Sequence, residues 1–465
     1  MAESHDEFLS SDLTENLKII DEKMKLTADL KRRKLMFHDK TLFILYLDTI
    51  TDKESIELHI INPINKQESD SIEKTLGAIQ FSIMTTFKDI STSLAEGNSI
   101  LLTENSNIAY SITTSADENR SVEESVNEKV TMGAHDSFVE SAATNISLLR
   151  KRLRTPDFKV EYHTYGPETN VQVAICYLDS KVNPNVLQSI KSRLDKIKDN
   201  DLLNSRQIQE TLEDFPYSPF PQSLRTERPD RAVFNLLNGN TVIFLNHEPS
   251  ALVTPISFYS FLRSPEDYNS RWFVNFFYYC LRLLAFILSV TLPAFYIAVN
   301  AYHSSILPVS TFYTLKLSVL NVPFHPFVEA IMMQIVLELL KEASVRLPSA
   351  VAQTIGTVGA IVIGSAIVQT NFISNTMVVV IAITAVSSFI IPNGEMSTSM
   401  RLMSFPLIFL AAMFGFIGIA FGLMVYTTHL VKLTSAGKAY VEAPNIIQSF
   451  FSRKNGKGQD ANALE

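Results

Sequence analysis

Four long apolar runs in the carboxyl-terminal part of the chain limit its possible folds more than any other feature. They cover approximately residues 276–299, 351–369, 372–391 and 403–427. Crossing a hydrocarbon core about 30 Å thick takes roughly 20 helical residues, and each run is long enough for one crossing. The sequence therefore predicts an α-helical membrane domain with about four spans over residues 263–435.

A further apolar segment, residues 326–341, differs from these runs because polar side chains interrupt it. Glu329, Gln334 and Glu338 lie within it, and we expect a re-entrant or amphipathic helix. A carboxylate at membrane depth costs about 3 kcal/mol or more, and it usually faces protein or water along an ion route. We therefore predict that these three residues line an ion pathway. The alternative is that Glu338 pairs with Lys341, or Glu342 with Arg346, and merely fixes a helix end near the membrane surface.

Small residues recur in the second apolar run. Gly356, Ala360 and Gly364 are spaced by four, so on a helix they form one stripe that lets another helix approach closely. The predicted helix-packing or oligomer interface consists of Gln353, Gly356, Thr357, Gly359, Ala360 and Gly364. The alternative is that glycine is simply frequent in membrane helices.

Basic residues flank the apolar runs and indicate their orientation. Arg263, Arg271 and Arg282 precede or begin the first run, and a basic and polar tail at residues 436–465 follows the last. Basic flanks mark the cytoplasmic side. We therefore expect the amino-terminal region and the carboxyl terminus on that side. The opening residues MAESHDEF contain neither the positive nor the apolar part of a signal peptide, which agrees with this orientation.

The charged residues are distributed unevenly. Of the 40 Lys and Arg, 10 follow residue 275, whereas 7 of the 48 Asp and Glu do, so that 30 basic and 41 acidic residues precede it. Because phosphate contacts need a basic face, this balance disfavours nucleic acid as a partner. For the two cysteines, Cys176 and Cys280, we expect buried free thiols rather than a disulfide or metal framework.

The region before the membrane domain contains an internal duplication. The segment LFILYLD from residue 42 matches VAICYLD from residue 173, and EGNSILL from residue 96 matches NGNTVIF from residue 238. Each copy is typical of a strand, an acidic turn, helices and a Gly-Asn hairpin that joins two strands. We therefore predict two similar α/β subdomains at residues 1–118 and 156–262, joined by a charged connector helix at residues 119–155.

Local patterns predict two helices within these copies. In the first copy, a three-and-four spacing predicts one long helix with a buried stripe of Ile72, Leu76, Ile79, Ile83, Phe87, Ile90 and Leu94. In the second copy, Asn183 followed by Pro184 predicts a capped helix start. Asp48 and Asp179 end equivalent strands, where a ligand site and a turn or capping carboxylate are the two interpretations.

Arg228, Asp230 and Arg231 follow a proline-dense connector, and they predict either an interface clamp of the soluble domain or a solvated turn. No nucleophile elbow, Walker A loop, dinucleotide fingerprint or HExxH motif occurs in the sequence. The nine histidines lack the spacing of metal ligands. The sequence therefore predicts a protein that is not an enzyme and that needs no cofactor or metal.

Several ordered motifs together resemble the A subunits of the GerA family of spore germinant receptors. They are YSPFPQ (217–222), TERPDR (226–231), SPEDYNSRW (264–272), NVPFHPFVEA (321–330), KEASVRLP (341–348) and QTIGTVGAIVIGSAIVQ (353–369). The likeness extends from about residue 40 to about residue 440. Two positions depart from the family pattern: Met132-Gly133-Ala134 replaces the usual Arg-Gly-Pro, and Gly364-Ser365 replaces a frequent Gly-Gln.

The resemblance implies a multi-pass subunit in the inner membrane of a bacterial spore, surrounded by membrane lipid. It implies work with a transporter-like B subunit that binds small germinants and with a lipoprotein C subunit. It further implies a homo-oligomer that acts as a ligand-gated cation channel. Two alternatives stay open: a secondary transporter acting alone, and a membrane-anchored scaffold or transducer for the other receptor subunits.

Overall fold

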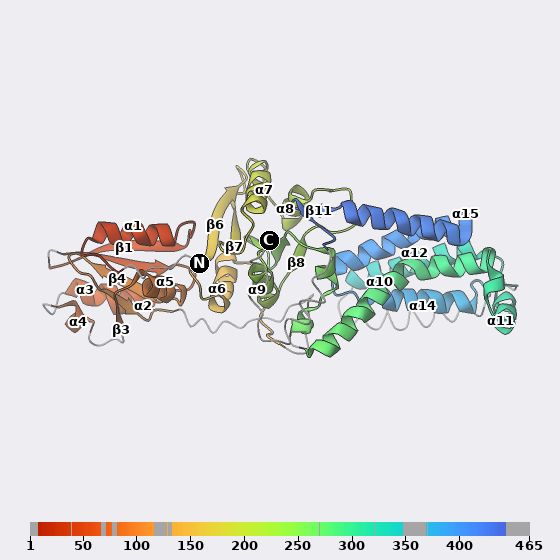
Figure 1. Cartoon of the computed structure of the whole chain (residues 1–465), viewed down its shortest axis with the longest axis horizontal. Coiled ribbons are helices and arrows are strands. Elements are labelled where there is room, and N and C mark those ends of the chain that lie inside the picture. Colours follow the sequence, from red (N-terminus) through yellow and green to blue (C-terminus); the bar gives the residue numbers. More distant parts are fainter. Residues whose placement is uncertain are drawn as a thin grey trace, which may run out of the picture. The chain divides into compact units, whose positions relative to one another are not determined.

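The computed structural model of the 465-residue chain describes residues 8–38, 40–66, 71–76, 81–115, 128, 133–268, 270–320, 322–346, 369 and 371–442. The chain forms two compact units, which we describe separately (Figure 1). Unit 1 comprises residues 1–216, 223–256 and 435–438, and unit 2 comprises residues 217–222, 257–434 and 439–465.

Unit 1 contains two five-stranded antiparallel sheets with the same topology (Figure 1). The first sheet has the order β1-β2-β4-β5-β3, and the second has the order β6-β7-β9-β10-β8. The first set is β1 (Leu30–Phe37), β2 (Lys40–Leu47), β3 (Phe81–Met84), β4 (Ser99–Thr103) and β5 (Ala109–Ile112). The second set is β6 (Phe158–Tyr165), β7 (Val171–Leu178), β8 (Leu224–Thr226), β9 (Thr241–Leu245) and β10 (Ala251–Thr254). The predicted duplication into two α/β subdomains is confirmed.

Helices cover both faces of the first sheet. Their bounds are α1 (Leu13–Lys23), α2 (Lys53–Ile56), the π-helix η1 (Glu57–Ile61), α3 (Asn62–Lys66), α4 (Ile72–Thr75) and α5 (Phe87–Ala95). Alternating residues of β2 supply the two cores. Leu45 packs in one with α1 and α5, whereas Ile44 packs in the other with α2, η1 and α3. This period of two is the pattern expected of a strand buried on both faces.

The second sheet carries α6 (Ala142–Arg152), α7 (Pro184–Asp195), α8 (Ser205–Leu212) and α9 (Pro229–Leu237). Asn183 caps α7 by accepting a hydrogen bond from the N–H of Asn185, and Pro184 is the first helical residue, as predicted. Ile190 of α7 and Ile208 of α8 are buried against Ile175 of β7 in one core. These contacts hold α7 and α8 on a common face of the sheet.

The long helix predicted between Ile72 and Leu94 is wrong. Among the described residues of this stretch, α4 and α5 are separate and strand β3 lies between them, paired with β5. The side chain of Thr86 starts α5 by accepting a hydrogen bond from the N–H of Asp89. Ile83 is an exposed strand residue, whereas Phe87 of α5 is buried as expected. Strand pairing therefore overrides a helical spacing that was fortuitous in its first half.

The two Gly-Asn pairs do not form hairpins, which corrects the sequence prediction. Each pair ends a helix: the N–H of Asn98 bonds to the carbonyl of Ser93, and the N–H of Asn240 bonds to that of Asn235. Gly97 and Gly239 have φ of +93° and +81°, as a glycine in this type of helix cap requires. The two copies thus share a helix-ending device.

Close packing explains why both caps need glycine. A Cβ on Gly97 would lie 3.1 Å from the carbonyl oxygen of Ile50, and one on Gly239 would lie 2.4 Å from that of Lys181. Ile50 and Lys181 occupy matching positions after β2 and β7. Asp48, in the first of these turns, pairs with Lys53, which agrees with its interpretation as a turn residue.

A buried ion pair joins the two halves of unit 1. Arg150 of α6 binds Asp29, before β1, through Nε–Oδ2 and Nη2–Oδ1 contacts of 2.8 Å each, and both side chains are 1% exposed. Asp29 also accepts a 2.6 Å bond from the Thr49 hydroxyl. The N–H of Ala28 donates to the carbonyl of Val160 in β6. The subdomains therefore meet through specific polar contacts.

Unit 2 is helical. Its elements are the 3-10 turns η2 (Phe258–Leu262), η3 (Pro265–Tyr268) and η4 (Ser304–Ile306), and the helices α10 (Trp272–Ala301), α11 (Val309–Leu320), α12 (Pro326–Arg346), α14 (Asn375–Phe389) and α15 (Gly394–Lys432). The short strands β11 (Thr434–Ser435) and β12 (Lys438–Ala439) follow. Among the described residues, α10 and α15 are long and apolar enough to cross a membrane, and α14 is a shorter apolar helix.

Helix α15 turns back on itself at Gly415, which lies within the apolar run at 403–427 for which one span was expected. Gly415 has φ +60° and ψ −136°, which are not helical values. Beyond it, a Cβ on Gly418 would lie 2.1 Å from the carbonyl oxygen of Leu410. The Tyr426 hydroxyl donates a 2.8 Å bond to the carbonyl of Met403. The two arms of α15, before and after Gly415, are therefore antiparallel neighbours (Figure 1).

Candidate functional site

The polar residues predicted to line an ion pathway lie on α12, which is a continuous helix of 21 residues. The structure places them at different levels and gives them different partners. Glu329 and Gln334 are fully buried within unit 2, whereas the Glu338 side chain is 34% exposed. Glu329 and Gln334 are buried in a single chain without any partner subunit, so their side chains face the interior of unit 2.

Glu329 caps the neighbouring helix α14. Ser374 precedes α14 as its N-cap, and its hydroxyl oxygen accepts from the N–H of Met377. The N–H of Ser374 in turn donates a 2.9 Å bond to Oε2 of Glu329. In a capping box, a residue of the helix itself usually satisfies that N–H. Here a carboxylate from α12 does so, and the positive end of the α14 dipole stabilises its charge.

Unsatisfied polar atoms remain around these residues. Oε1 of Glu329 and both side-chain polar atoms of Gln334 are buried and have no hydrogen-bond partner among the described residues. Buried polar groups are nearly always bonded to protein or to ordered water. These atoms are therefore the part of α12 best suited to hold a water molecule or a cation within the helical unit.

Glu338 pairs with Arg401 in the first arm of α15, a partner that the sequence did not suggest. Nε of Arg401 lies 2.6 Å from Oε1 of Glu338, and the Arg401 side chain is 2% exposed. One turn further along α12, Nζ of Lys341 donates to Thr398 at 3.4 Å. The signal that could have found this contact is a lone Arg just before an apolar run, but the predicted span began after Arg401.

The contacts also fix the directions of the helices. Glu338 with Arg401 and Lys341 with Thr398 show that α12 and the first arm of α15 are antiparallel. Glu329 joins the start of α12 to the start of α14. At the end of α10, the Tyr302 hydroxyl donates to the carbonyls of Ala412 and Met413, just before the Gly415 turn. These contacts satisfy carbonyls that the turn leaves without helical partners.

The predicted packing interface at Gln353, Gly356, Thr357, Gly359, Ala360 and Gly364 lies outside the described residues. The whole second apolar run except Gln369 does so as well. Both cysteines are free thiols: Cys176 is buried as expected, whereas Cys280 is exposed on α10, which corrects the expectation that both are buried. Among the described residues, no group of three or more His, Cys, Asp and Glu side chains is arranged to hold a metal ion.

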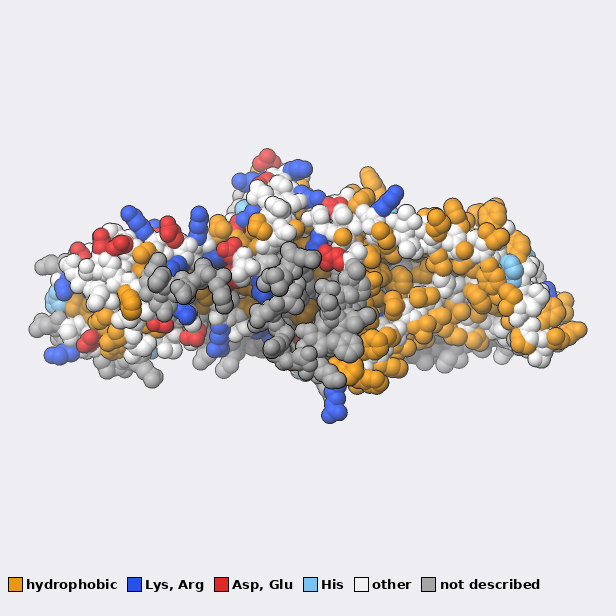
Figure 2. Space-filling model, in the orientation of Figure 1, with side chains coloured by type: hydrophobic (Ala, Val, Ile, Leu, Met, Phe, Trp, Pro, Cys, Tyr) orange, Lys and Arg blue, Asp and Glu red, His pale blue; other side chains and the backbone are white. Residues whose placement is uncertain are grey.

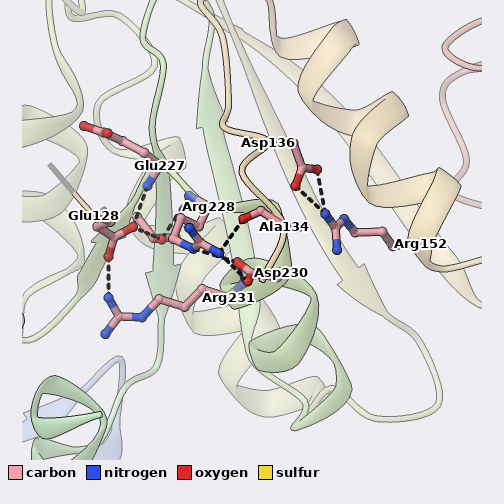
Figure 3. A network of polar contacts seen from close by, with 9 residues as sticks. Glu128, Ala134, Asp136, Arg152, Glu227, Arg228, Asp230 and Arg231 are labelled. Carbon is pink, nitrogen blue, oxygen red and sulfur yellow. Dashed lines mark hydrogen bonds and ion pairs between the residues drawn. The ribbon is translucent and has the colours of Figure 1, made fainter. Parts of the chain in front are cut away.

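In unit 1, the predicted residues Arg228, Asp230 and Arg231 form a buried polar network at the start of α9 (Figure 3). Both arginine side chains are 2% exposed, so the alternative of a solvated turn is wrong. Arg228 binds Asp230 with two contacts, Nε–Oδ1 at 3.0 Å and Nη2–Oδ2 at 2.7 Å. Such a bidentate pair fixes the guanidinium plane.

This network holds residues of the predicted connector (Figure 3). Nη2 of Arg228 donates to the carbonyl of Ala134 at 2.9 Å, and Arg231 forms an ion pair with Glu128. Glu128 also accepts a 2.6 Å bond from the Thr226 hydroxyl. Arg152 of α6 binds both carboxylate oxygens of Asp136 at 2.6 Å. The motif TERPDR therefore fastens residues 128 and 134 to the second subdomain.

Comparisons with known proteins extend over most of the chain. A family model described as Bacillus/Clostridium GerA spore germination protein matches residues 18–453. Spore germination protein A1 of Bacillus subtilis (strain 168) is 34% identical over 445 residues, 95% of this chain and 92% of that protein. The uncharacterized membrane protein YfkQ of the same organism is 33% identical over 449 residues, 95% and 88% of the two chains. The crystal structure of the N-terminal domain of the A subunit of the Bacillus megaterium spore germinant receptor GerK3 aligns with 26% identity and a TM-score of 0.42, covering 55% of this chain and 98% of that one.

Proposed function

Because the chain belongs to the GerA family of spore germination proteins, we propose that it is the A subunit of a nutrient-sensing receptor in the inner membrane of a bacterial spore. The match over residues 18–453, which includes both the α/β region and the apolar helices, is the observation that carries this proposal. A role in germination without catalysis also agrees with the lack of enzyme motifs in the sequence.

The surface of unit 2 supports a membrane location. Figure 2 shows hydrophobic side chains gathered over its helices. Large apolar residues are exposed on α10, α14 and α15, including Phe277, Val379 and Ile417. A soluble monomer rarely exposes so continuous an apolar surface. Trp272 and Tyr278 are exposed near the start of α10, where aromatic residues of membrane proteins meet the lipid headgroups.

We propose six crossings rather than four. The contacts above place the end of α12 and the start of α14 at opposite ends of the helix bundle. We propose that the apolar run at 351–369, which is long enough for one span, makes the crossing between these two ends. Together with α10, α12, α14 and the two arms of α15, this crossing gives a total of six, which is an even number. Relative to the four predicted spans, α12 adds one crossing and the reversal at Gly415 adds another. The number therefore stays even, and both ends of the membrane domain again face the cytoplasmic side.

We also propose that the subunit assembles into a homo-oligomer through the small-residue stripe at 353–364. This stripe permits close helix contact in lipid, where small residues favour association. Native mass spectrometry of the protein in nanodiscs should give a discrete oligomer. Gly356→Leu and Gly364→Leu should reduce it to monomers, whereas Gly394→Leu, which has open space around its Cβ position, should not. A monomeric wild-type protein would contradict the proposal.

Within this assembly, we propose a cation route along α12, with Glu329, Gln334 and Glu338 as its polar residues. The proposal is supported by two carboxylates and by the buried amide of Gln334, which has no partner within the described ranges, all on one membrane helix. Carboxylates at this depth commonly mark ion routes. A route within each subunit agrees best with the burial of Glu329 and Gln334 in a single chain.

We propose the transporter-like B subunit and the lipoprotein C subunit as partners, with Arg228, Asp230 and Arg231 acting at a soluble-domain interface. Since both arginines are buried, their role would be to fix the connector residues that form the interface rather than to contact a partner. The domains predicted at 1–118, 119–155, 156–262, 263–435 and 436–465 remain our working division.

Deletion of the gene in its spore-forming host tests the receptor role. Spores without the protein should lose the germination response to at least one nutrient, and an intact copy should restore it. A panel of amino acids, sugars and nucleosides should be used, with the release of monovalent cations as the early readout. Deletion spores that respond to every nutrient like the wild type would contradict the proposal.

A further inference from the structure

Arg401 is a buried cation inside the helical unit, and one carboxylate from another helix balances its charge. Its side chain is 2% exposed. Nη1 donates to Ser397 at 2.9 Å and Nη2 donates to Thr398 at 3.1 Å, both on the preceding turn of α15. These hydroxyls are neutral. The described anionic partner is Glu338 of α12, at 2.6 Å from Nε.

The two members of the ion pair differ in how strongly each depends on the other. A buried guanidinium without a counter-ion is strongly destabilising. The Glu338 side chain, in contrast, is 34% exposed, so the protein encloses it less than it encloses Arg401. Arg401 therefore depends on the pair more than Glu338 does. In the paired state, the carboxylate that would attract a cation is already neutralised.

We propose that Arg401 is a charge lock on the cation route: it holds Glu338 in the closed state and must release it when the route opens. This inference rests on the proposed channel function and names its regulation. It makes Arg401 a positioning residue that acts through Glu338. The pair links two antiparallel helices, so a shift of α12 against the first arm of α15 would open it.

The neighbouring cation Lys341 provides a matched control. It lies three residues after Glu338 on α12, and its Nζ donates to Thr398, which also accepts from Arg401. Arg401→Met and Lys341→Met each remove one positive charge and leave an unbranched apolar side chain. The first removes the 2.6 Å ion pair with Glu338, whereas the second removes the 3.4 Å contact with Thr398. A general change of local charge and a specific release of Glu338 can therefore be separated.

The test measures potassium flux through the full-length protein, reconstituted in liposomes with its B and C subunits, with and without nutrient. Arg401→Met should raise the nutrient-independent flux at least tenfold, and Lys341→Met should stay within about twofold of the wild type. Adding Glu338→Gln to Arg401→Met should abolish most of the leak, since the released carboxylate is then absent. A leak that persists in the double variant would overturn the lock.

Arg401→Lys guards against misfolding, because it keeps the buried charge and loses the planar contacts with Ser397 and Thr398. It should give a leak between those of the wild type and Arg401→Met. Wild-type basal flux in both Arg401 variants, with nutrient-driven flux intact, would overturn the lock but leave the channel standing. Absence of nutrient-driven flux in the wild type would instead refute the channel itself.

Discussion

Oε2 of Glu329, at the start of α12, accepts a 2.9 Å hydrogen bond from the backbone N–H of Ser374, the residue that caps α14. One carboxylate thus completes the cap of another helix, while its second oxygen has no partner in the part of the chain that the structure describes. The capping role and the proposed ion-binding role therefore meet in the same side chain.

Two substitutions at Glu329 separate these roles. Glu329→Gln keeps an oxygen that can accept from Ser374, whereas Glu329→Leu leaves that buried N–H unsatisfied, which costs about 1–3 kcal/mol. We expect Glu329→Leu to lower the unfolding temperature clearly and Glu329→Gln to lower it less, while both reduce cation flux. Thermal unfolding followed by the fluorescence of Trp272, the single tryptophan, measures this. Equal destabilisation by the two variants would contradict the capping account.

The turn at Gly415 predicts a strict need for glycine in the arm that follows it. An alanine Cβ at Gly418 would lie 2.1 Å from the backbone oxygen of Leu410, and backbone cannot easily move away. We expect Gly418→Ala to destabilise unit 2 by about 1–3 kcal/mol, the usual range for overpacking. Gly394→Ala is the control, because no atom of the described residues lies within 4 Å of its Cβ position. If Gly418→Ala and Gly394→Ala unfold at the same temperature, the two arms of α15 are not packed as described.

Two glycines of unit 1 have nearly the same φ: Gly239 lies in a helix cap, and Gly437 lies between β11 and β12. Gly239 and Gly437 have φ of +81° and +83°, so an alanine at either position costs about 1–2 kcal/mol from conformation. Only Gly239 also faces a backbone oxygen, that of Lys181 at 2.4 Å. Gly239→Ala should therefore destabilise unit 1 more than Gly437→Ala. Urea-dependent proteolysis of the two variants measures the difference, and equal midpoints would refute the packing argument.

Unit 1 should lose stability in acid partly through Glu161 of β6. Burial raises the pKa of this carboxyl, but contacts with His163, Lys191 and Tyr177 outweigh it and hold the pKa at about 2, below its usual 4.5. Because the folded pKa is the lower one, the stabilisation is complete above pH 4.5 and is lost as the pH falls toward 2.

Glu161→Gln removes this contribution. The variant should be less stable than the wild type at pH 6.5, and the difference should shrink between pH 4.5 and pH 2. Urea unfolding of the solubilised chain, followed by circular dichroism, tests both points. A difference between the two proteins that is constant with pH would show that the ionised carboxylate contributes no stability.

The α/β duplication was predictable because local matches such as LFILYLD and VAICYLD carry the strand pattern of each copy. The cap at Asn183 was predictable for the same reason, since capping depends on neighbouring residues. The long helix between Ile72 and Leu94 was mispredicted because the pairing of β3 with β5 joins residues distant in sequence.

In the helical unit, apolar length indicated the helices but not the reversal at Gly415. Glycine is common in the apolar runs of membrane helices, so Gly415 by itself did not indicate a turn. The close approach of Gly418 to Leu410, which identifies the turn, is a tertiary contact. The polar residues of α12 could be singled out as costly in lipid. Their partners could not, because Ser374 and Arg401 meet α12 only through packing.

The most direct test of the central claim is potassium flux through the purified protein reconstituted with its B and C subunits. The account predicts that a nutrient which triggers germination discharges a potassium gradient across these liposomes, and that Glu338→Gln reduces the discharge while the complex still assembles. A fully assembled complex that binds nutrient and leaves the gradient intact would contradict the account.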